Sequence, residues 1–330
     1  MSAVPRRPDR PPAADRPVPH RPDRPPALNG TPVTNGNPRT SATPALADTS
    51  AAGAPVATFR FDPALEDLLP PARRGVPIEH SFLATPAVKD AIEALGVPHP
   101  EVGAILVNGH PAGFDYRLRD GDDVRVFGPV AIAAMSGAGH VAPAGAPAEG
   151  QPAPAATPGQ GPVSLMRAVP EPPRFVLDGH LGRLARYLRM LGFDAAYRND
   201  ADDAELARCS AAEERILLTR DRGLLRRSVV RLGYLLRNDD PRAQLAEVER
   251  RYGLAERANP FTRCIRCNGL IEPAERAAVA DRLQPKTLRY YDTFGRCRSC
   301  GTVYWPGSHY ERMRRVIDEL AGVERTEPGS

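Results

Sequence analysis

Short apolar runs alternate with amphipathic segments from residue 174 to residue 253, and this alternation constrains the fold more than any other feature of the sequence. The apolar runs have the length of buried strands, and the segments between them repeat leucine or alanine at helical spacing. Repeated strand–helix units place helices over a parallel sheet, so this region is predicted to be an α/β domain. The predicted strands are 175–178, 194–199, 215–221 and 233–238, and the predicted helices are 180–192, 202–214, 222–233 and 241–253.

Two of these strands end on an aspartate, Asp178 in the first and Asp221 in the third. Ligands of open α/β sheets bind at the carboxyl ends of the strands, where neighbouring strands would bring the two carboxylates together. Asp203, early in a helix, is placed to point to the same edge. Clustered carboxylates repel one another unless a cation lies between them. Hard oxygen ligands indicate Mg²⁺ or Mn²⁺, which activate water for phosphodiester hydrolysis.

Each of these acids could instead be a helix N-cap, because aspartate is favoured at that position. Asp202 with Glu205 three residues later forms a capping-box pattern. A cap is the favoured interpretation of Asp240, which directly precedes a proline. Asp239 or Asn238 is a weaker candidate for a fourth metal ligand.

Four of the five cysteines form two CxxC pairs, Cys264 with Cys267 and Cys297 with Cys300. Two such knuckles make a tetrahedral zinc site, which would be closed by its four thiolates and therefore structural. A redox dithiol is the alternative, and the presence of two pairs in one small region argues against it. Cys209, in an alanine-rich helix, is expected to be a small buried hydrophobe.

The formal net charge of +4 permits a nucleic-acid partner without requiring one. Two arginines three residues apart share a face of the first helix, and another stands beside Asp221, so all three are candidates to bind substrate phosphates. Basic residues also alternate with tyrosines between the cysteine pairs, as in surfaces that contact RNA. An ordinary solvated face remains the alternative. His180 is expected to be structural or on the surface rather than catalytic. The candidate RNA-binding residues are Arg183, Arg186, Arg220, Lys286 and Arg289.

The remaining sequence divides by composition. A proline-rich start is expected to be disordered, and an Ala/Gly/Pro stretch in the middle is expected to be a flexible linker. The segment between them has strand, strand, helix, strand and strand patterns in that order, which predicts a small β-grasp fold. A terminal helix is predicted at 311–322. The predicted divisions are a disordered arm at 1–54, the β-grasp domain at 55–130, the linker at 131–172, the α/β domain at 173–258, and a zinc ribbon with its C-terminal helix at 259–325.

The stretches LDGHLGRLARYLRMLGFDA, DDAEL and ILLTRD resemble the family named for the C-terminal domain of the Mut-seven exonuclease, which is placed among PIN-like RNases. The resemblance runs from residue 174 to the end of the chain and implies a PIN-like fold. It also implies that Asp178, Asp203 and Asp221 are metal-binding acids. A clear fourth aspartate is hard to place.

The stretches ILVNG and LRDGDDVRVF resemble ubiquitin-like sulfur carriers of the ThiS and MoaD type, and a ubiquitin-like module is also found joined to the Mut-seven family. Those carriers act through a free C-terminal Gly-Gly. Here the corresponding segment, Phe127 to Val130, continues into further chain. Carrier chemistry is therefore expected to be absent, and the module is expected to bind a protein partner.

The sequence thus predicts a metal-dependent, PIN-like ribonuclease that acts on RNA and uses Mg²⁺ or Mn²⁺ for catalysis and Zn²⁺ for structure. A non-catalytic RNA- or protein-binding module is one alternative, and an accessory factor linked to sulfur transfer or RNA modification is another. No run of about 18 apolar residues is present, and neither is a secretory signal pattern. With paired rather than scattered cysteines, the expected location is the cytoplasm.

Overall fold

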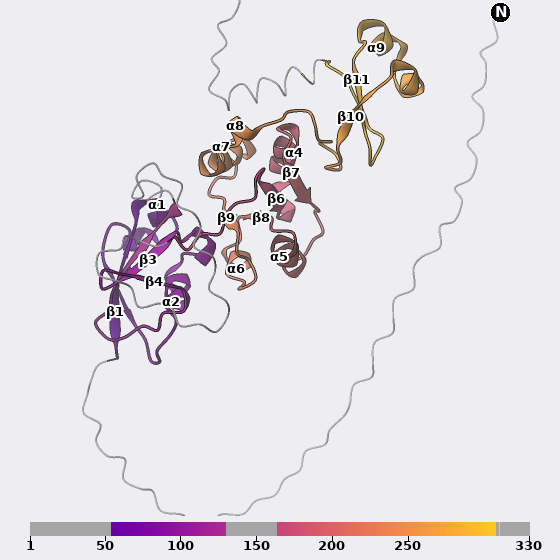
Figure 1. The fold of residues 1–330 in the computed structure, drawn as a ribbon. Helices are drawn as coiled ribbons and strands as arrows, with labels where there is room; N and C mark the ends of the chain where they lie inside the picture. The colour runs from indigo at the N-terminus through magenta and orange to yellow at the C-terminus, as the bar shows by residue number, and fades with distance from the viewer. Residues whose placement is uncertain (1–53, 130–163, 308–309, 311–330) are drawn as a thin grey trace, which may run out of the picture. The chain divides into compact units, whose positions relative to one another are not determined.

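The computed structural model describes residues 54–129, 164–307 and 310 (Figure 1). The predictions for the proline-rich arm, for most of the linker and for a helix at 311–322 fall outside these residues. Among the helices of the described residues, none has the length and apolar character needed to cross a membrane.

The N-terminal domain is a five-stranded sheet in the order β2-β1-β5-β3-β4, in which only β1 and β5 pair in parallel. Helix α2 packs on this sheet through Val88, Ile92 and Leu95, whose spacing places them on one buried face. This arrangement confirms the predicted β-grasp fold. A four-residue helix after the first strand was not expected. The elements are β1 (Val56–Phe61), α1 (Pro63–Glu66), β2 (Ile78–Ser81), α2 (Val88–Leu95), β3 (Ala104–Val107), β4 (His110–Ala112) and β5 (Asp123–Phe127).

The second domain has a four-stranded sheet in the order β7-β6-β8-β9, and all of its strands are parallel, as the strand–helix alternation predicts. Its strands are β6 (Arg174–Leu177), β7 (Asp194–Tyr197), β8 (Ile216–Thr219) and β9 (Gly233–Leu235). Its helices are α4 (Gly182–Met190), α5 (Asp203–Ala212), α6 (Arg222–Leu225), α7 (Pro241–Tyr252) and α8 (Leu254–Arg257).

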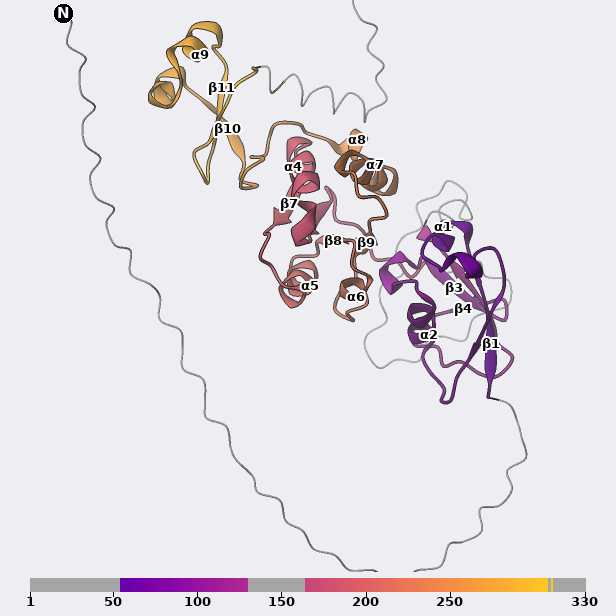
Figure 2. The same cartoon turned by 180° about the vertical axis from the view of Figure 1, so that it is seen from behind.

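Helices cover both faces of this sheet, with α4 and α7 on one side and α5 and α6 on the other (Figures 1 and 2). Alternate residues of each strand face opposite sides. Phe175 and Leu177 therefore pack with the leucines of α4, while Val176 packs with Leu206 of α5. Because both faces are buried, the strands are continuous apolar runs rather than alternating ones.

The cysteine pairs adjoin a separate three-stranded antiparallel sheet in the order β10-β11-β12, in which Cys297 ends the central strand. Its strands are β10 (Ile271–Ala274), β11 (Phe294–Cys297) and β12 (Val303–Tyr304), and helix α9 (Pro285–Tyr290) lies in the insert between β10 and β11.

Candidate active site

Asp178 and Asp221 lie at the carboxyl ends of β6 and β8, which are adjacent parallel strands. Buried Thr219, the last residue of β8, joins them. Its hydroxyl donates to Oδ2 of Asp178 over 2.8 Å and accepts from the backbone N–H of Asp221 over 2.9 Å. The sequence therefore brings these two acids to the same edge of the sheet, as expected. We call Asp178, Asp221 and the turn after β9 the acidic rim.

The two acids differ in their second role. Asp221 also caps α6, because its Oδ1 accepts from the N–H of Gly223 over 2.7 Å. Asp178 makes no such cap bond, although a helical turn follows it directly. Its half-buried carboxylate accepts from Thr219 instead. The N-cap interpretation therefore applies to Asp221, which also belongs to the acidic rim, and does not apply to Asp178.

Asp203 is the first residue of α5, and the helix is capped by its neighbour Asp202, which accepts from the N–H of Glu205 over 2.8 Å. Asp202 is thus the N-cap, as the capping-box pattern predicts, but the carboxylate of Glu205 pairs with Arg198 instead of completing the box. The exposed carboxylate of Asp203 lies 3.8 Å from the guanidinium of Arg227. The structure does not bring Asp203 into a three-acid cluster with Asp178 and Asp221.

The turn after β9 completes the acidic rim with Asp239, which is exposed and paired with Arg220. Helix α7 fixes this turn through hydrogen bonds. Buried Glu247 accepts from the N–H groups of Arg237 (3.0 Å) and Asn238 (2.9 Å). The spacing of Glu247 on its helix would have shown that it faces the core, and a buried carboxylate needs donors, but the sequence does not say which backbone groups supply them. The next aspartate, Asp240, caps α7 as predicted.

The acidic rim fits a magnesium-type ion through two carboxylates rather than three. Among the described residues, the four ribbon cysteines form the one group of three or more His, Cys, Asp or Glu side chains close enough to share an ion. Mg²⁺ commonly takes one or two carboxylates and completes its octahedron with water and substrate phosphate. Asp178 and Asp221, at adjacent strand ends, fit that donor set.

The four cysteines converge as predicted, with ligand atoms all within 4.8 Å of one another. The sulfurs of Cys264 and Cys300 are 3.6 Å apart, and those of Cys267 and Cys297 are 3.4 Å apart. A zinc tetrahedron with bonds of about 2.3 Å has edges of about 3.8 Å, so the cluster fits Zn²⁺. The fifth cysteine, Cys209, is half-buried beside the core, and burial raises its pKa.

The ribbon is fastened to the α/β domain at Asp194, the first residue of β7. Its carboxylate accepts from Arg215 (2.7 Å) and from the side-chain amide of Asn268 (2.7 Å), and Arg263 lies 3.4 Å away. Burial alone would raise the pKa of Asp194, but these donors hold it below its ordinary value. This anchor could not be predicted from the sequence, because its residues are far apart along the chain.

Buried Arg189 of α4 is a second anchor. It donates to the carbonyls of Ile265 and Arg266 in the first cysteine knuckle at 3.3 and 3.2 Å, and to Ala195 at 2.9 Å. Burial lowers the pKa of its guanidinium. The first knuckle is thereby held against α4.

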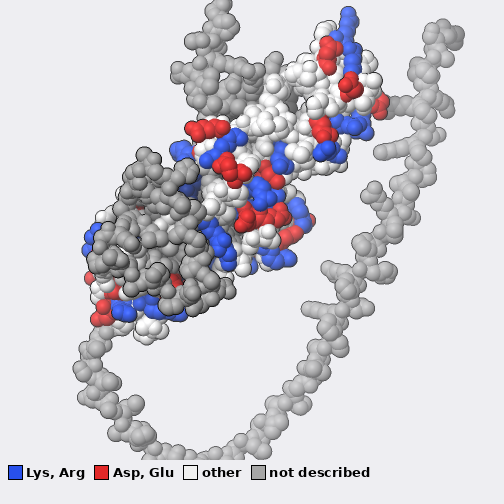
Figure 3. Space-filling model, in the orientation of Figure 1, with Lys and Arg blue, Asp and Glu red and all other residues white. Residues whose placement is uncertain are grey.

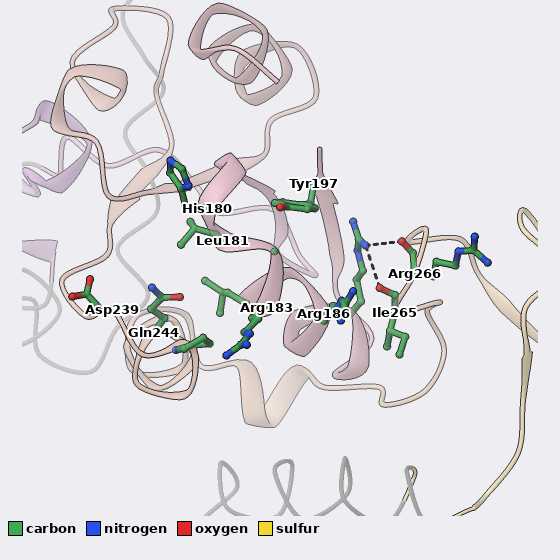
Figure 4. Close-up of a pocket in the computed structure, with 13 residues that line it drawn as sticks. His180, Leu181, Arg183, Arg186, Tyr197, Asp239, Gln244, Ile265 and Arg266 are labelled. Atoms are coloured by element: carbon green, nitrogen blue, oxygen red, sulfur yellow. Dashed lines mark hydrogen bonds between the residues drawn. The ribbon is translucent and has the colours of Figure 1, made fainter. Parts of the chain in front are cut away.

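A cavity of about 690 Å³ opens beside the acidic rim (Figure 4). Its walls come from α4, from the start of α7 and from the first knuckle. Arg183 and Arg186, two of the predicted RNA-binding residues, line it together with exposed His180. Arg220 instead pairs with Asp239. Lys286 and Arg289 are exposed on α9, in the ribbon insert, and do not line the cavity.

The fold and site define a chain in which a ubiquitin-like β-grasp domain precedes an α/β domain with acids at its strand ends and a cysteine ribbon. Comparison with protein-family models identifies these parts. Residues 173–317 match the Mut7-C RNAse domain, and residues 54–133 match the Mut7-C ubiquitin domain. These matches confirm the resemblance of the two segments to those families, and the RNase-domain match indicates a nuclease-like function. No curated protein and no solved structure gives a significant match.

Proposed function

We propose that this protein is a metal-dependent ribonuclease that hydrolyses RNA phosphodiester bonds at the acidic rim. The observation that carries the proposal is the placement of Asp178 and Asp221 at adjacent strand ends, joined through Thr219. The family match supplies the class of reaction.

In this proposal Asp178 and Asp221 hold a magnesium or manganese ion. The bound ion supplies an activated water and stabilises negative charge on the phosphate. Thr219 orients the carboxylate of Asp178, and the arginines of α4 position the RNA backbone beside it. Asp203 remains a candidate third acid, because the family resemblance implies it, although its carboxylate faces Arg227.

The other parts have supporting roles in this proposal. The ribbon binds Zn²⁺ through its four cysteines and helps to bind RNA through exposed residues of the insert, including Lys286, Arg289 and Tyr290. The β-grasp domain binds a protein partner. The proposed location is the cytoplasm.

Cleavage of labelled single-stranded and structured RNAs by the full chain tests the proposal, with Mg²⁺, with Mn²⁺ or with neither. We expect cleavage that needs the metal and falls about a hundredfold or more in Asp178→Asn and in Asp221→Asn, since removal of a group that acts in the transition state has effects of this size. Asp200→Asn is the matched control, because Asp200 is an acid that follows the end of β7 and is exposed, like Asp221, and it pairs with Arg198 over 3.2 Å.

Asp203→Asn measures the role of the third acid. Because Asp203 lies outside the acidic rim, we expect Asp203→Asn to lose less cleavage activity than Asp178→Asn. Equal rates in the wild type and in Asp178→Asn and Asp221→Asn, with RNA binding intact, would contradict the ribonuclease and favour a non-catalytic RNA-binding module.

A further inference from the structure

Three arginines with open guanidinium groups line the cavity beside the acidic rim. Arg183 and Arg186 lie on α4, and Arg266 lies in the first cysteine knuckle. All three side chains are exposed. Within the described part of the chain, none of their guanidinium groups has a hydrogen-bond or ion-pair partner. A fourth arginine of the cavity, Arg189, is used differently, because its guanidinium is buried and bonded to backbone carbonyls.

The negative charge of the cavity wall is largely neutralised. Asp239 is the one acid among the lining residues, and its carboxylate pairs with Arg220, which lies outside the cavity. The three open guanidinium groups therefore leave an excess of positive charge. This excess is local: on the face that Figure 3 shows, basic and acidic side chains are interspersed rather than gathered into one basic surface. An anion would therefore be attracted to this region by the three cavity arginines rather than by an extended basic surface.

The cavity has the size of a small-ligand site. Its volume of about 690 Å³ lies within the range of roughly 300 to 1,000 Å³ in which proteins bind ligands such as a nucleotide. The knuckle forms one wall and is fixed there by Arg189. Tyr197 lines another side (Figure 4), and it is fixed by a 2.7 Å bond from its hydroxyl to the carbonyl of Gly179. Two sides of the cavity are therefore held in place by contacts within the chain.

We propose that this cavity binds a phosphomonoester group at an end of the RNA chain. The inference rests on the proposed ribonuclease and names the part of the substrate that this subsite takes. A terminal phosphate carries a charge of about −1.5 to −2 at neutral pH, whereas each internal phosphodiester carries one negative charge. Several guanidinium groups around one anion favour the more highly charged group. His180 and Asp239 lie on the border between the cavity and the acidic rim, so an end held here places the adjoining chain beside Asp178.

The test is the binding of short labelled RNAs of one sequence to the full zinc-loaded chain, without Mg²⁺ or Mn²⁺ so that hydrolysis does not interfere. One RNA carries a 5′-phosphate, one a 3′-phosphate and one has no terminal phosphate. We expect at least one phosphorylated RNA to bind about tenfold tighter than the unphosphorylated one, as expected for added charge-assisted hydrogen bonds. Orthophosphate should compete for this gain.

The gain should disappear in the double variant Arg183→Gln/Arg186→Gln and in Arg266→Gln. It should persist in Arg208→Gln, the matched control, since Arg208 is an exposed arginine of α5 on the opposite face of the sheet. Zinc content and the melting temperature confirm that each variant is folded. Equal binding of the three RNAs, or a gain that survives in the cavity variants, would overturn the inference.

The two proposals fail separately. If the wild type cleaves RNA with dependence on Asp178 but binds all three RNAs equally, the ribonuclease stands and the terminal-phosphate subsite is wrong. If the phosphate preference depends on the cavity arginines but no metal-dependent cleavage occurs, the subsite stands and the catalytic proposal is wrong.

Discussion

The hydroxyl of Thr219 donates a 2.8 Å hydrogen bond to the carboxylate of Asp178, across two adjacent parallel strands. The same hydroxyl accepts from the N–H of Asp221. Thr219 is fully buried, so its hydroxyl has no access to water and is committed to these two partners. One side chain therefore fixes the geometry of both acids.

Thr219→Val keeps the shape of this side chain and removes both hydrogen bonds. We expect a loss of about 1 to 3 kcal/mol in the free energy of unfolding, because the backbone N–H of Asp221 and the carboxylate of Asp178 both lose this partner. Metal-dependent cleavage should fall by about 10 to 100-fold, as expected for a residue that orients a metal ligand. Urea unfolding and cleavage rates measure the two effects.

Ser210→Ala is the matched control for Thr219→Val. The buried hydroxyl of Ser210 donates to the carbonyl of Arg215 over 2.7 Å, before the start of β8 and so at the opposite end of that strand from Thr219. Its loss should destabilise the chain while leaving cleavage unchanged under conditions where the protein is folded. Equal losses of activity in the two variants would show that Thr219 acts through stability alone.

Cys297→Ser should abolish zinc binding. Cys297 is buried within the four-cysteine cluster, and in small zinc modules the free energy of metal binding is largely the free energy of folding. We expect one zinc ion per wild-type chain, none in the variant, and rapid proteolysis of the variant within residues 259–307. Cys209→Ser should keep its zinc, because Cys209 lies outside the cluster. Full zinc occupancy in Cys297→Ser would contradict the four-cysteine site.

The parallel sheet and the pairing of Asp178 with Asp221 could be predicted from the sequence because both follow from local patterns. Apolar runs ending on an acid, followed by helical spacing, give the strand direction, and parallel strands place their carboxyl ends at one edge. The cysteine spacing similarly predicts the zinc site. These features depend on residues close together in the sequence.

The residues missed in the sequence are those whose partners lie far along the chain. Asp194 meets Asn268 over a separation of 74 residues, and Arg189 meets Ile265 over 76. Glu247 is visible as a buried position, but its partners in the 237–238 turn are set by tertiary packing. Asp203 was expected to point to the edge that holds Asp178 and Asp221, but its carboxylate faces Arg227. The position of a residue on a helix does not determine whether its side chain reaches a neighbouring strand end.

Gly192→Ala should be strongly destabilising. Gly192 ends α4 with a φ of +94°, and an added Cβ would overlap the carbonyl oxygen of Asn259, in the segment that leads into the ribbon. Gly109→Ala is the matched control, since Gly109 has a φ of +81° with no atom within 4 Å of the added Cβ. Both variants carry backbone strain of about 1 to 2 kcal/mol. We expect Gly192→Ala to lose more unfolding free energy than Gly109→Ala, and the difference, measured by urea unfolding, is the cost of the overlap. Equal losses in the two variants would show that the overlap costs nothing.

Asp194→Asn should weaken the anchor of the ribbon and change how stability depends on pH. The variant leaves Arg215 and Arg263 facing a neutral group, and breaking a largely buried ion pair costs about 3 kcal/mol. The pKa of Asp194 is lower in the folded chain than its ordinary value of 3.8. Its contribution is therefore fully present above pH 3.8 and is lost as the pH falls through the folded pKa.

The difference in unfolding free energy between the wild type and Asp194→Asn should accordingly be constant from neutral pH to about pH 5 and should shrink below pH 4. Taking the difference cancels the titration of the other carboxylates, which both proteins share. Urea unfolding at a series of pH values measures it. A difference that grows as the pH falls would contradict the lowered pKa. A difference near zero at pH 7 would show that Asn268 and the arginines bind the amide as well as they bind the carboxylate.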